Sequence, residues 1–311
     1  MMNRWLRERV DAAYEQLLSR EIDGVPTHVA VIQDGNRRYA RRQGADATDG
    51  HRAGAETTEH VLEWCQEVGV EELTLYAFST ENFDRPAEER EALYDLLCEK
   101  LREFADAERV HDNGVKIRAL GAVDRLPDRV QETVDYAEER TADYDRFVLN
   151  IALAYGGRSE LLEAARGVAR DVEEGEVDPE EIDVEAIERR LYDEPVRDVD
   201  LIIRTGGDER TSNFLPWHAN GNEAAVFFCT PYWPEFSKPD FLRGIRTYEH
   251  RQESWRRTRA RRALALLGAM SDPELAEARS IVDRFRDSLP TAEQPDEDEL
   301  EGVDSSGPAA D

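Results

Sequence analysis

The stretch that decides the fold runs from His28 to Gly44 and reads HVAVIQDGNRRYARRQG. Residues 29–32 are apolar and mostly β-branched, which is typical of a strand buried on both faces. A turn signal, Asp34-Gly35-Asn36, ends this strand and precedes an arginine-rich segment of helical character. Open α/β sheets bind anionic ligands where a buried strand meets a helix N-terminus in this way. Taken by itself, the Asp-Gly-Asn triplet fits a plain Asx turn that ends a strand better than it fits a ligand site.

The chain has 311 residues and a formal net charge of −29, and arginine supplies nearly all of its cations. Nucleic acid is not an expected partner, because this field would repel phosphate. The composition resembles that of proteins adapted to high salt and points to a halophilic archaeon. The sequence shows neither a membrane-length apolar run nor a signal-peptide core, so we expect a cytoplasmic protein. The three cysteines have no metal-ligand spacing.

Strand and helix patterns alternate along the chain, which predicts an α/β fold: a single domain with a mostly parallel central sheet flanked by helices. Strands are expected at 29–32, 73–78, 115–120, 147–154, 201–203 and 224–228, and helices at 3–20, 51–68, 87–110, 127–142, 158–173 and from about 238 onward, with a loop at 174–185. The expected organisation is an N-terminal helix in 1–24, a catalytic domain in 25–255, a helical extension in 256–289 and an acidic disordered tail in 290–311.

Polar clusters follow several of the predicted strands, at Asp34, 79–85, 156–157 and 204–207. Right-handed crossovers bring such ends to one edge of a parallel sheet, so one shared site is expected. Arg204 and Arg210 flank a Gly-Gly turn, which could bring both guanidiniums to one anion.

Four ordered blocks closely resemble the cis-prenyltransferases, the polyprenyl or undecaprenyl diphosphate synthases. They are HVAVIQDGNRRYARRQG with GHRAG at 50–54, LTLYAFSTENFDRP at 73–86, LNIALAYGGR at 149–158, and DLIIRTGGDERTSNFLPW at 200–217 with Glu223 downstream. The resemblance implies Mg²⁺-dependent condensation of isopentenyl diphosphate onto an allylic diphosphate primer of farnesyl or geranylgeranyl type. The product would be a long-chain polyprenyl diphosphate, a precursor of a dolichol-type glycan carrier. It further implies a homodimer that contacts the membrane peripherally for product release.

The same resemblance assigns roles to residues. Asp34 would be the catalytic carboxylate and a magnesium ligand, with Glu223 as its metal partner. The allylic diphosphate would be held by Gly35, Asn36, Arg37, Arg38, Tyr39 and His51, and isopentenyl diphosphate by Arg204, Arg210, Thr211 and Ser212. A mobile loop over the reacting carbons would contain Ser79, Thr80, Glu81, Asn82, Phe83 and Arg85. Either Asn82 or the departing diphosphate would take the proton. Apolar residues between Ser212 and Phe236, among them Phe214 and Leu215, are expected at the dimer interface.

Three positions depart from the family pattern. Ala47 stands where many relatives have a diphosphate-binding arginine, and Glu209 replaces a residue that is often histidine. Ser254-Trp255-Arg256 stands where the family frequently has Arg-x-Gly. The last departure keeps an alternative open, in which the chain is a subunit of a two-component enzyme and needs a partner chain. The aspartate-rich motif of trans-prenyltransferases and the P-loop of nucleotide hydrolases do not occur. Product length and preferred primer stay open.

Overall fold

A computed structural model describes residues 22, 24–192, 196–219 and 224–252. All the elements described below belong to one compact unit that ends at Gln252. The predicted N-terminal helix lies almost entirely outside the described residues. The predicted extension at 256–289 and the predicted tail at 290–311 lie wholly outside them.

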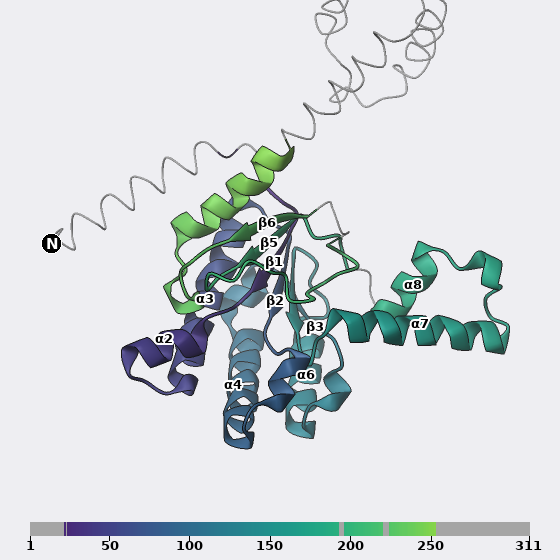
Figure 1. Cartoon of the computed structure of the whole chain (residues 1–311), viewed down its shortest axis with the longest axis horizontal. Helices are drawn as coiled ribbons and strands as arrows, with labels where there is room; N and C mark the ends of the chain where they lie inside the picture. Colours follow the sequence, from purple (N-terminus) through teal and green to yellow (C-terminus); the bar gives the residue numbers. More distant parts are fainter. Residues whose placement is uncertain (1–21, 23, 193–195, 220–223, 253–311) are drawn as a thin grey trace, which may run out of the picture. The chain divides into compact units, whose positions relative to one another are not determined.

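The centre of this unit is a six-stranded sheet in the order β3-β4-β2-β1-β5-β6, and all its neighbouring strands are parallel (Figure 1). The predicted α/β class with a parallel central sheet is therefore confirmed. The strands are β1 (His28–Ile32), β2 (Glu72–Tyr76), β3 (Val115–Leu120), β4 (Phe147–Ala152), β5 (Leu201–Arg204) and β6 (Ala225–Phe228).

The strand order reverses at β1. The chain leaves β1 for β2 on one side and later returns to β5 on the other, so Ile32 is paired with both Tyr76 and Arg204. In open α/β sheets, the crevice at the carboxyl end of such a switch point is the usual ligand site.

The helices are α2 (Asn36–Gln43), α3 (Ala47–Val68), α4 (Ala87–Asp106), α5 (Glu108–Asp112), α6 (Asp128–Thr141), α7 (Gly157–Glu174), α8 (Val184–Leu191) and a last helix whose described part is 238–252. Short 3₁₀ turns are η1 (Thr80–Asp84), η2 (Val123–Arg125), η3 (Pro179–Glu181) and η4 (Trp233–Glu235).

Strands β2 and β4 each end two residues earlier than predicted, and three helix boundaries differ more clearly from the sequence-based prediction. Helix α3 begins four residues early, because Asp46 and Asp49 form a capping box that satisfies its first backbone N–H groups. The single helix predicted at 87–110 divides at Ala107, whose backbone is extended. The stretch predicted as a loop up to residue 185 leads into α8, whose first turn is capped by the Asp183 side chain.

Alternating strand residues build a core on each face of the sheet. Val29, Val31 and Leu73 pack with residues from α3, α4 and α6. On the opposite face, Ala30 and Ile202 pack with Phe214 and Leu215. Phe214 and Leu215 are at most 1% exposed within this single chain, so their predicted place at a dimer interface is wrong.

Within the described ranges, no helix has the length and apolarity needed to cross a membrane.

Candidate active site

The backbone of Asp34 is fixed just beyond the end of β1. Its N–H donates to Oγ1 of Thr205 at 3.1 Å, and the same hydroxyl donates to the Asp34 carbonyl at 2.7 Å. The backbone N–H of Trp233 also donates to that carbonyl, at 3.0 Å. These contacts from the β5 and β6 side hold the carboxylate at the switch point of the sheet.

Two arginines bracket the Asp34 carboxylate. Nη2 of Arg38 lies 2.8 Å from Oδ1, and Nη2 of Arg204 lies 2.7 Å from Oδ2. Burial alone would raise the pKa of Asp34, but the hydrogen bonds from Arg204 and Arg38 outweigh it and lower that pKa below its ordinary value. Asp34 is therefore ionised at neutral pH, while 27% of its side chain stays accessible.

Arg204 is the most buried charge of the site, with 4% of its side chain exposed. Its Nη1 donates to the carbonyl of Arg210 at 2.6 Å and to the hydroxyl of Ser212. Its Nη2 donates to Oδ2 of Asp208 at 3.2 Å, and Nη2 of Arg210 donates to the same oxygen at 2.9 Å. The predicted convergence of the two guanidiniums on one anion thus occurs on a protein carboxylate.

Two glycines make this convergence geometrically accessible. Gly206 and Gly207 both have positive φ, 85° and 81°, a conformation that side chains disfavour. A Cβ on Gly206 would also lie 2.5 Å from Nη2 of Arg38. The sequence analysis missed Asp208. Its contacts with Arg204 and Arg210 depend on how the turn folds back, which the sequence does not show.

An anion pocket lies at the N-terminus of α2. Its cavity of about 330 Å³ is lined by Gln33, Asp34, Gly35, Asn36, Arg37, Arg38, Arg41, His51 and Arg85. Four of these residues are arginines, whose planar forks suit phosphate oxygens, and the helix N-terminus adds backbone N–H groups. Gly35 has φ 107°, and a Cβ there would meet the Tyr232 ring at 2.7 Å. Of the residues predicted to bind the allylic diphosphate, all but Tyr39 line this pocket.

His51 is uncharged in this setting. Burial, followed by the charges of Arg85 and Arg37, lowers the pKa of His51 to about 4. Nη1 of Arg85 lies 3.4 Å from Nε2 of His51. Glu89 balances both arginines, at 2.9 Å from Arg85 and 3.4 Å from Arg37.

Helix α3 approaches α2 unusually closely, through two glycines of the GHRAG block. A Cβ on Gly50 would lie 2.2 Å from the Asn36 carbonyl, and one on Gly54 would lie 2.4 Å from Oδ1 of Asn36. Oδ1 of Asn36 is buried and has no hydrogen-bond partner within the described part of the chain. The role of these glycines was also missed from the sequence, since a helix pattern does not reveal which neighbour lies against it.

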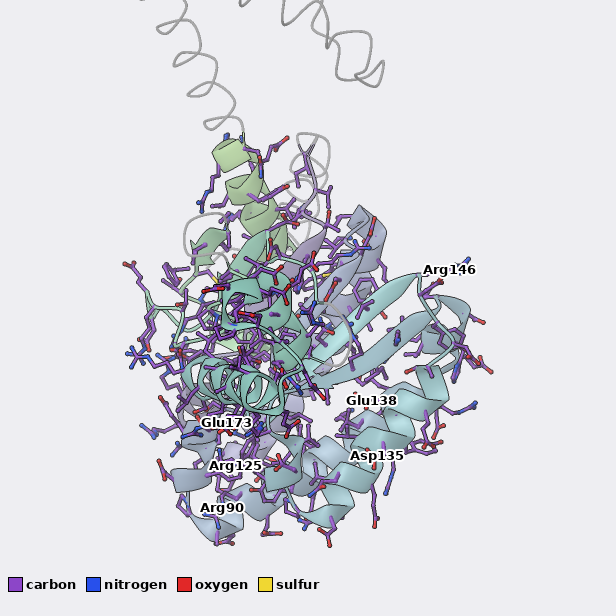
Figure 2. All side chains as sticks on the ribbon, turned by 90° about the vertical axis from the view of Figure 1, so that its right-hand side faces the viewer. Arg90, Arg125, Asp135, Glu138, Arg146 and Glu173 are labelled. Atoms are coloured by element: carbon purple, nitrogen blue, oxygen red, sulfur yellow. The ribbon has the colours of Figure 1, made fainter. Side chains whose placement is uncertain are left out.

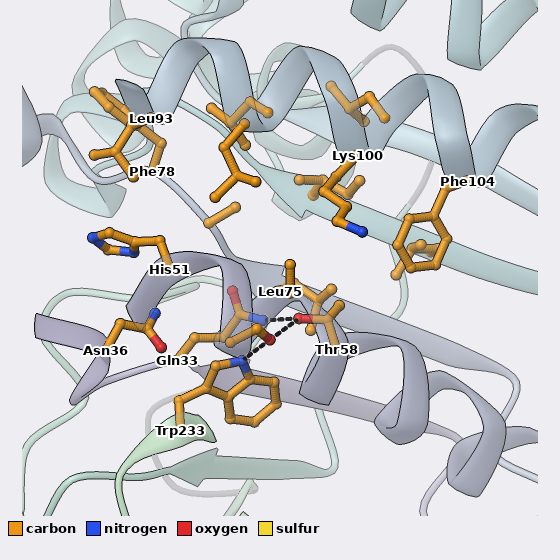
Figure 3. A pocket seen from close by; sticks show the side chains of 18 residues that line it. Gln33, Asn36, His51, Thr58, Leu75, Phe78, Leu93, Lys100, Phe104 and Trp233 are labelled. Carbon is orange, nitrogen blue, oxygen red and sulfur yellow. Dashed lines mark hydrogen bonds between the residues drawn. The ribbon is translucent and has the colours of Figure 1, made fainter. Parts of the chain in front are cut away.

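An apolar cavity of about 120 Å³ adjoins the anion pocket between α3 and α4 (Figure 3). Its walls include Leu75, Phe78, Leu93 and Phe104. Gln33, Asn36 and His51 line both spaces. A cationic pocket that shares a wall with an apolar cavity suits a ligand with a phosphate head and a hydrocarbon tail.

Comparison with known proteins agrees with this geometry. A family model described as "Putative undecaprenyl diphosphate synthase" matches residues 32–256. The chain belongs to this family, the cis-prenyltransferases. It is a prenyl-transferring enzyme of the class that elongates polyprenyl diphosphates in cis.

Two haloarchaeal relatives are similar over nearly their whole length, and both are named tritrans,polycis-undecaprenyl-diphosphate synthase (geranylgeranyl-diphosphate specific). The one from Halobacterium salinarum is 66% identical over 299 residues, covering 96% of this chain and 99% of the relative. The one from Haloarcula marismortui is 63% identical over 288 residues, with 93% and 95% covered. The predicted halophilic origin fits both sources.

Two solved structures are similar in fold. Lavandulyl diphosphate synthase from Lavandula x intermedia, in complex with dimethylallyl diphosphate, has a TM-score of 0.65 and 30% identity, over 72% of this chain and 95% of that one. A probable undecaprenyl diphosphate synthase from Campylobacter jejuni has a TM-score of 0.58 and 33% identity, over 73% and 96%.

The segment predicted as a mobile loop makes contacts both within itself and with neighbouring elements of this cis-prenyltransferase. The backbone N–H of Ser79 donates to Oδ1 of Asn82 at 2.9 Å, and Thr80 N–H donates to the Tyr155 carbonyl at 2.8 Å. The Phe83 carbonyl accepts from Nη1 of Arg90 at 2.9 Å, and its ring lies 4.7 Å from the Arg125 guanidinium carbon. Figure 2 shows Arg90 and Arg125 at the same end of the enzyme.

The remaining predicted site residues are placed as follows. Arg85 is the member of the 79–85 segment that lines the anion pocket, whereas Glu81 is exposed. Tyr39 is half-buried in α2, and the Thr211 carbonyl accepts from the Phe214 N–H at 3.0 Å. Glu223, the predicted metal partner of Asp34, lies outside the described residues.

Proposed function

We propose that this cis-prenyltransferase condenses isopentenyl diphosphate with geranylgeranyl diphosphate as the primer, and that it uses Mg²⁺. The primer is inferred from the haloarchaeal relatives, both named geranylgeranyl-specific. The observation that carries the proposal is the wall of Asn36 and His51, shared by a cationic pocket and an apolar cavity.

The primer diphosphate occupies the anion pocket, where Arg37, Arg38 and Arg85 supply charge-assisted hydrogen bonds. Its hydrocarbon tail enters the apolar cavity past His51. Isopentenyl diphosphate binds on the other side of Asp34, where Arg210 and Arg204 exchange the Asp208 carboxylate for phosphate oxygens. Asp208 thus holds the guanidiniums together before this substrate arrives.

The reaction breaks the bond between the primer's first carbon and its diphosphate oxygen, and the alkene of isopentenyl diphosphate attacks that carbon. A new carbon–carbon bond forms at the terminal alkene carbon, and a proton then leaves the carbon next to the resulting cationic carbon, which forms the new double bond. Arg37 and Arg38 stabilise the charge that develops on the departing diphosphate. Departing diphosphate is the better proton acceptor, because Oδ1 of Asn82 already accepts from Ser79 N–H and a neutral amide is a weak base.

The donor set at Asp34 fits magnesium. A hard cation takes oxygen ligands, and Mg²⁺ is commonly bound by one or two carboxylates together with substrate phosphates. Asp34 offers a partly accessible carboxylate beside the anion pocket, with Glu223 as the second candidate ligand. The described residues hold no ready-made group of three or more protein ligands, so phosphate oxygens would complete the coordination. When bound, the cation would neutralise charge on the leaving diphosphate.

We further propose that the enzyme works as a homodimer of this chain alone and contacts the membrane peripherally when it releases its product. Asp34, Asn82 and Arg204 are all retained, whereas a non-catalytic subunit would be expected to lose them. Both haloarchaeal relatives are named as synthases.

The test uses the purified full-length chain, labelled isopentenyl diphosphate and either geranylgeranyl or farnesyl diphosphate, with and without a chelator. We expect chelator-sensitive polyprenyl diphosphate synthesis and a higher kcat/KM for geranylgeranyl diphosphate. A preference for farnesyl diphosphate would overturn the primer assignment. Activity that appears only when a second chain is added would favour the two-component alternative.

A further inference from the structure

One charged side chain reaches into the apolar cavity. Lys100 on α4 lines it together with leucines, phenylalanines and other apolar residues of α3, α4, β2 and β4. Figure 3 shows its ammonium group pointing inward, near Phe104. Lysine side chains usually extend into solvent, so a lysine that lines an apolar cavity requires an explanation.

Lys100 belongs to a cluster that joins three helices. Its Nζ lies 3.4 Å from Oε1 of Glu59 on α3 and 2.6 Å from Oε2 of Glu103 on its own helix. Oε2 of Glu59 is held by Nη2 of Arg109 on α5, at 2.5 Å. We call Glu59, Lys100 and Arg109 the charged clasp. About four-fifths of the Glu59 and Lys100 side chains is buried, since 18% and 22% are exposed.

Glu59 and Lys100 of the clasp stay ionised. Burial would raise the pKa of Glu59, but Arg109 and Lys100 outweigh it and lower that pKa. Burial would lower the pKa of Lys100, but Glu103 and Glu59 outweigh it and raise that pKa. A hydrocarbon tail that meets the clasp therefore meets formal charges.

The clasp stands at the end of the cavity remote from the anion pocket. Asn36 and His51, which the two spaces share, lie at one end in Figure 3, and Lys100 and Phe104 lie at the other. Leu93 and Phe104 are eleven positions apart on α4, which corresponds to about 16.5 Å at 1.5 Å per residue. A tail whose diphosphate sits in the anion pocket points toward the clasp.

The cavity is also too small for the product. At about 120 Å³ it is close to a cavity that holds one benzene molecule, so a growing chain must separate α3 from α4. The clasp ties these helices together, and passing it would press hydrocarbon against buried charges, which is unfavourable.

We propose that the charged clasp closes the deep end of the tail cavity and limits the length of the product chain. This inference rests on the proposed function, because it needs a chain that grows from the anion pocket. Glu59, Lys100 and Arg109 are the groups that oppose further growth of the polyprenyl chain.

The test compares product lengths for wild type and three variants under one set of substrate concentrations. Lys100→Met keeps an unbranched side chain but removes the charge, and Arg109 still neutralises Glu59. Glu59→Gln removes the negative charge that pairs with both cations. The matched control is Glu99→Gln, which breaks the 3.6 Å pair with Arg52 between the same two helices; Glu99 is half exposed and does not line the cavity.

We expect both clasp variants to shift the product distribution to longer chains by at least one isoprene unit, with wild-type lengths from Glu99→Gln. Unchanged lengths in folded Lys100→Met and Glu59→Gln would overturn the proposal, as would an equal shift in the control. Lys100→Arg, which keeps the charge, should retain wild-type lengths if Lys100→Met does not fold. Failure of the proposed function would appear separately, as no elongation by the wild type.

Discussion

Asp34 and Arg204 are 170 residues apart in the chain, and their carboxylate and guanidinium meet at 2.7 Å. Neighbouring parallel strands bring them together, since Ile32 and Arg204 end β1 and β5 in register. Arg38 contacts the other oxygen of Asp34, and Asp208 pairs with Arg204, so the Asp34 carboxylate lies between two arginine-lined regions.

Arg210, the exposed partner of Arg204 at Asp208, can be replaced without disturbing the core. Arg210→Ala removes a side chain that is 69% exposed, and we expect the KM for isopentenyl diphosphate to rise while that for the primer changes little. One charge-assisted contact is worth about 1.5–3 kcal/mol, or about one to two powers of ten in affinity.

Steady-state kinetics with each substrate varied in turn measures this split. Arg140→Ala, at an exposed arginine of α6, is the control. If only the KM for the primer rose, the assignments of the two substrates to the two diphosphate sites would have to be reversed.

The close approach of α3 to α2 predicts a sensitive glycine. Gly54→Ala should raise the KM for the primer, because the new Cβ would lie 2.4 Å from Oδ1 of Asn36 and 2.8 Å from Cδ1 of Trp233. Alanine has the higher helix propensity by about 1 kcal/mol, so the loss must come from the clash. Gly24→Ala is the matched control, since its Cβ would have 3.8 Å to its nearest neighbour. Equal kinetics for the two variants would show that Asn36 is not positioned by this contact.

His51 gives a pH-dependent signature. Its pKa is lowered from 6.5 to about 4, so protons bind more readily to the unfolded chain. The His51 contribution to stability is complete above pH 6.5 and declines as the pH falls toward 4. Arg85→Met should move this pKa upward by removing the nearest positive charge. NMR titration of the imidazole signals measures both values, and a wild-type His51 that titrates near 6.5 would contradict the environment described here.

Sequence patterns predicted the sheet well because its strands are short apolar runs bounded by turn residues. Two of the helix starts they missed depend on capping. Asp46 and Asp49 start α3 within a stretch of mixed character, and Asp183 starts α8 inside an acidic segment that resembles a solvated loop. Such starts are decided by a few hydrogen bonds, which periodicity does not register.

The residues of the candidate site likewise fall into those that the sequence predicted and those that it missed. The resemblance located Asp34, Arg38 and Arg204 because each stands in a recognisable block. Asp208, Gly54 and Lys100 were missed, because their partners come from turn geometry or from other helices. On sequence alone, Lys100 is one more charge on an amphipathic helix, and only packing shows that it faces a cavity.

The turnover number of Asp34→Asn tests the central claim most directly, with Asp208→Asn as the matched comparison on the same arginine. We expect kcat of Asp34→Asn to fall by about 10²-fold or more, because leaving-group stabilisation is lost, while the variant stays folded. Asp208→Asn should change mainly the KM for isopentenyl diphosphate. A folded Asp34→Asn enzyme with a chelator-sensitive kcat within a few-fold of wild type would contradict the assignment of Asp34 as the catalytic carboxylate.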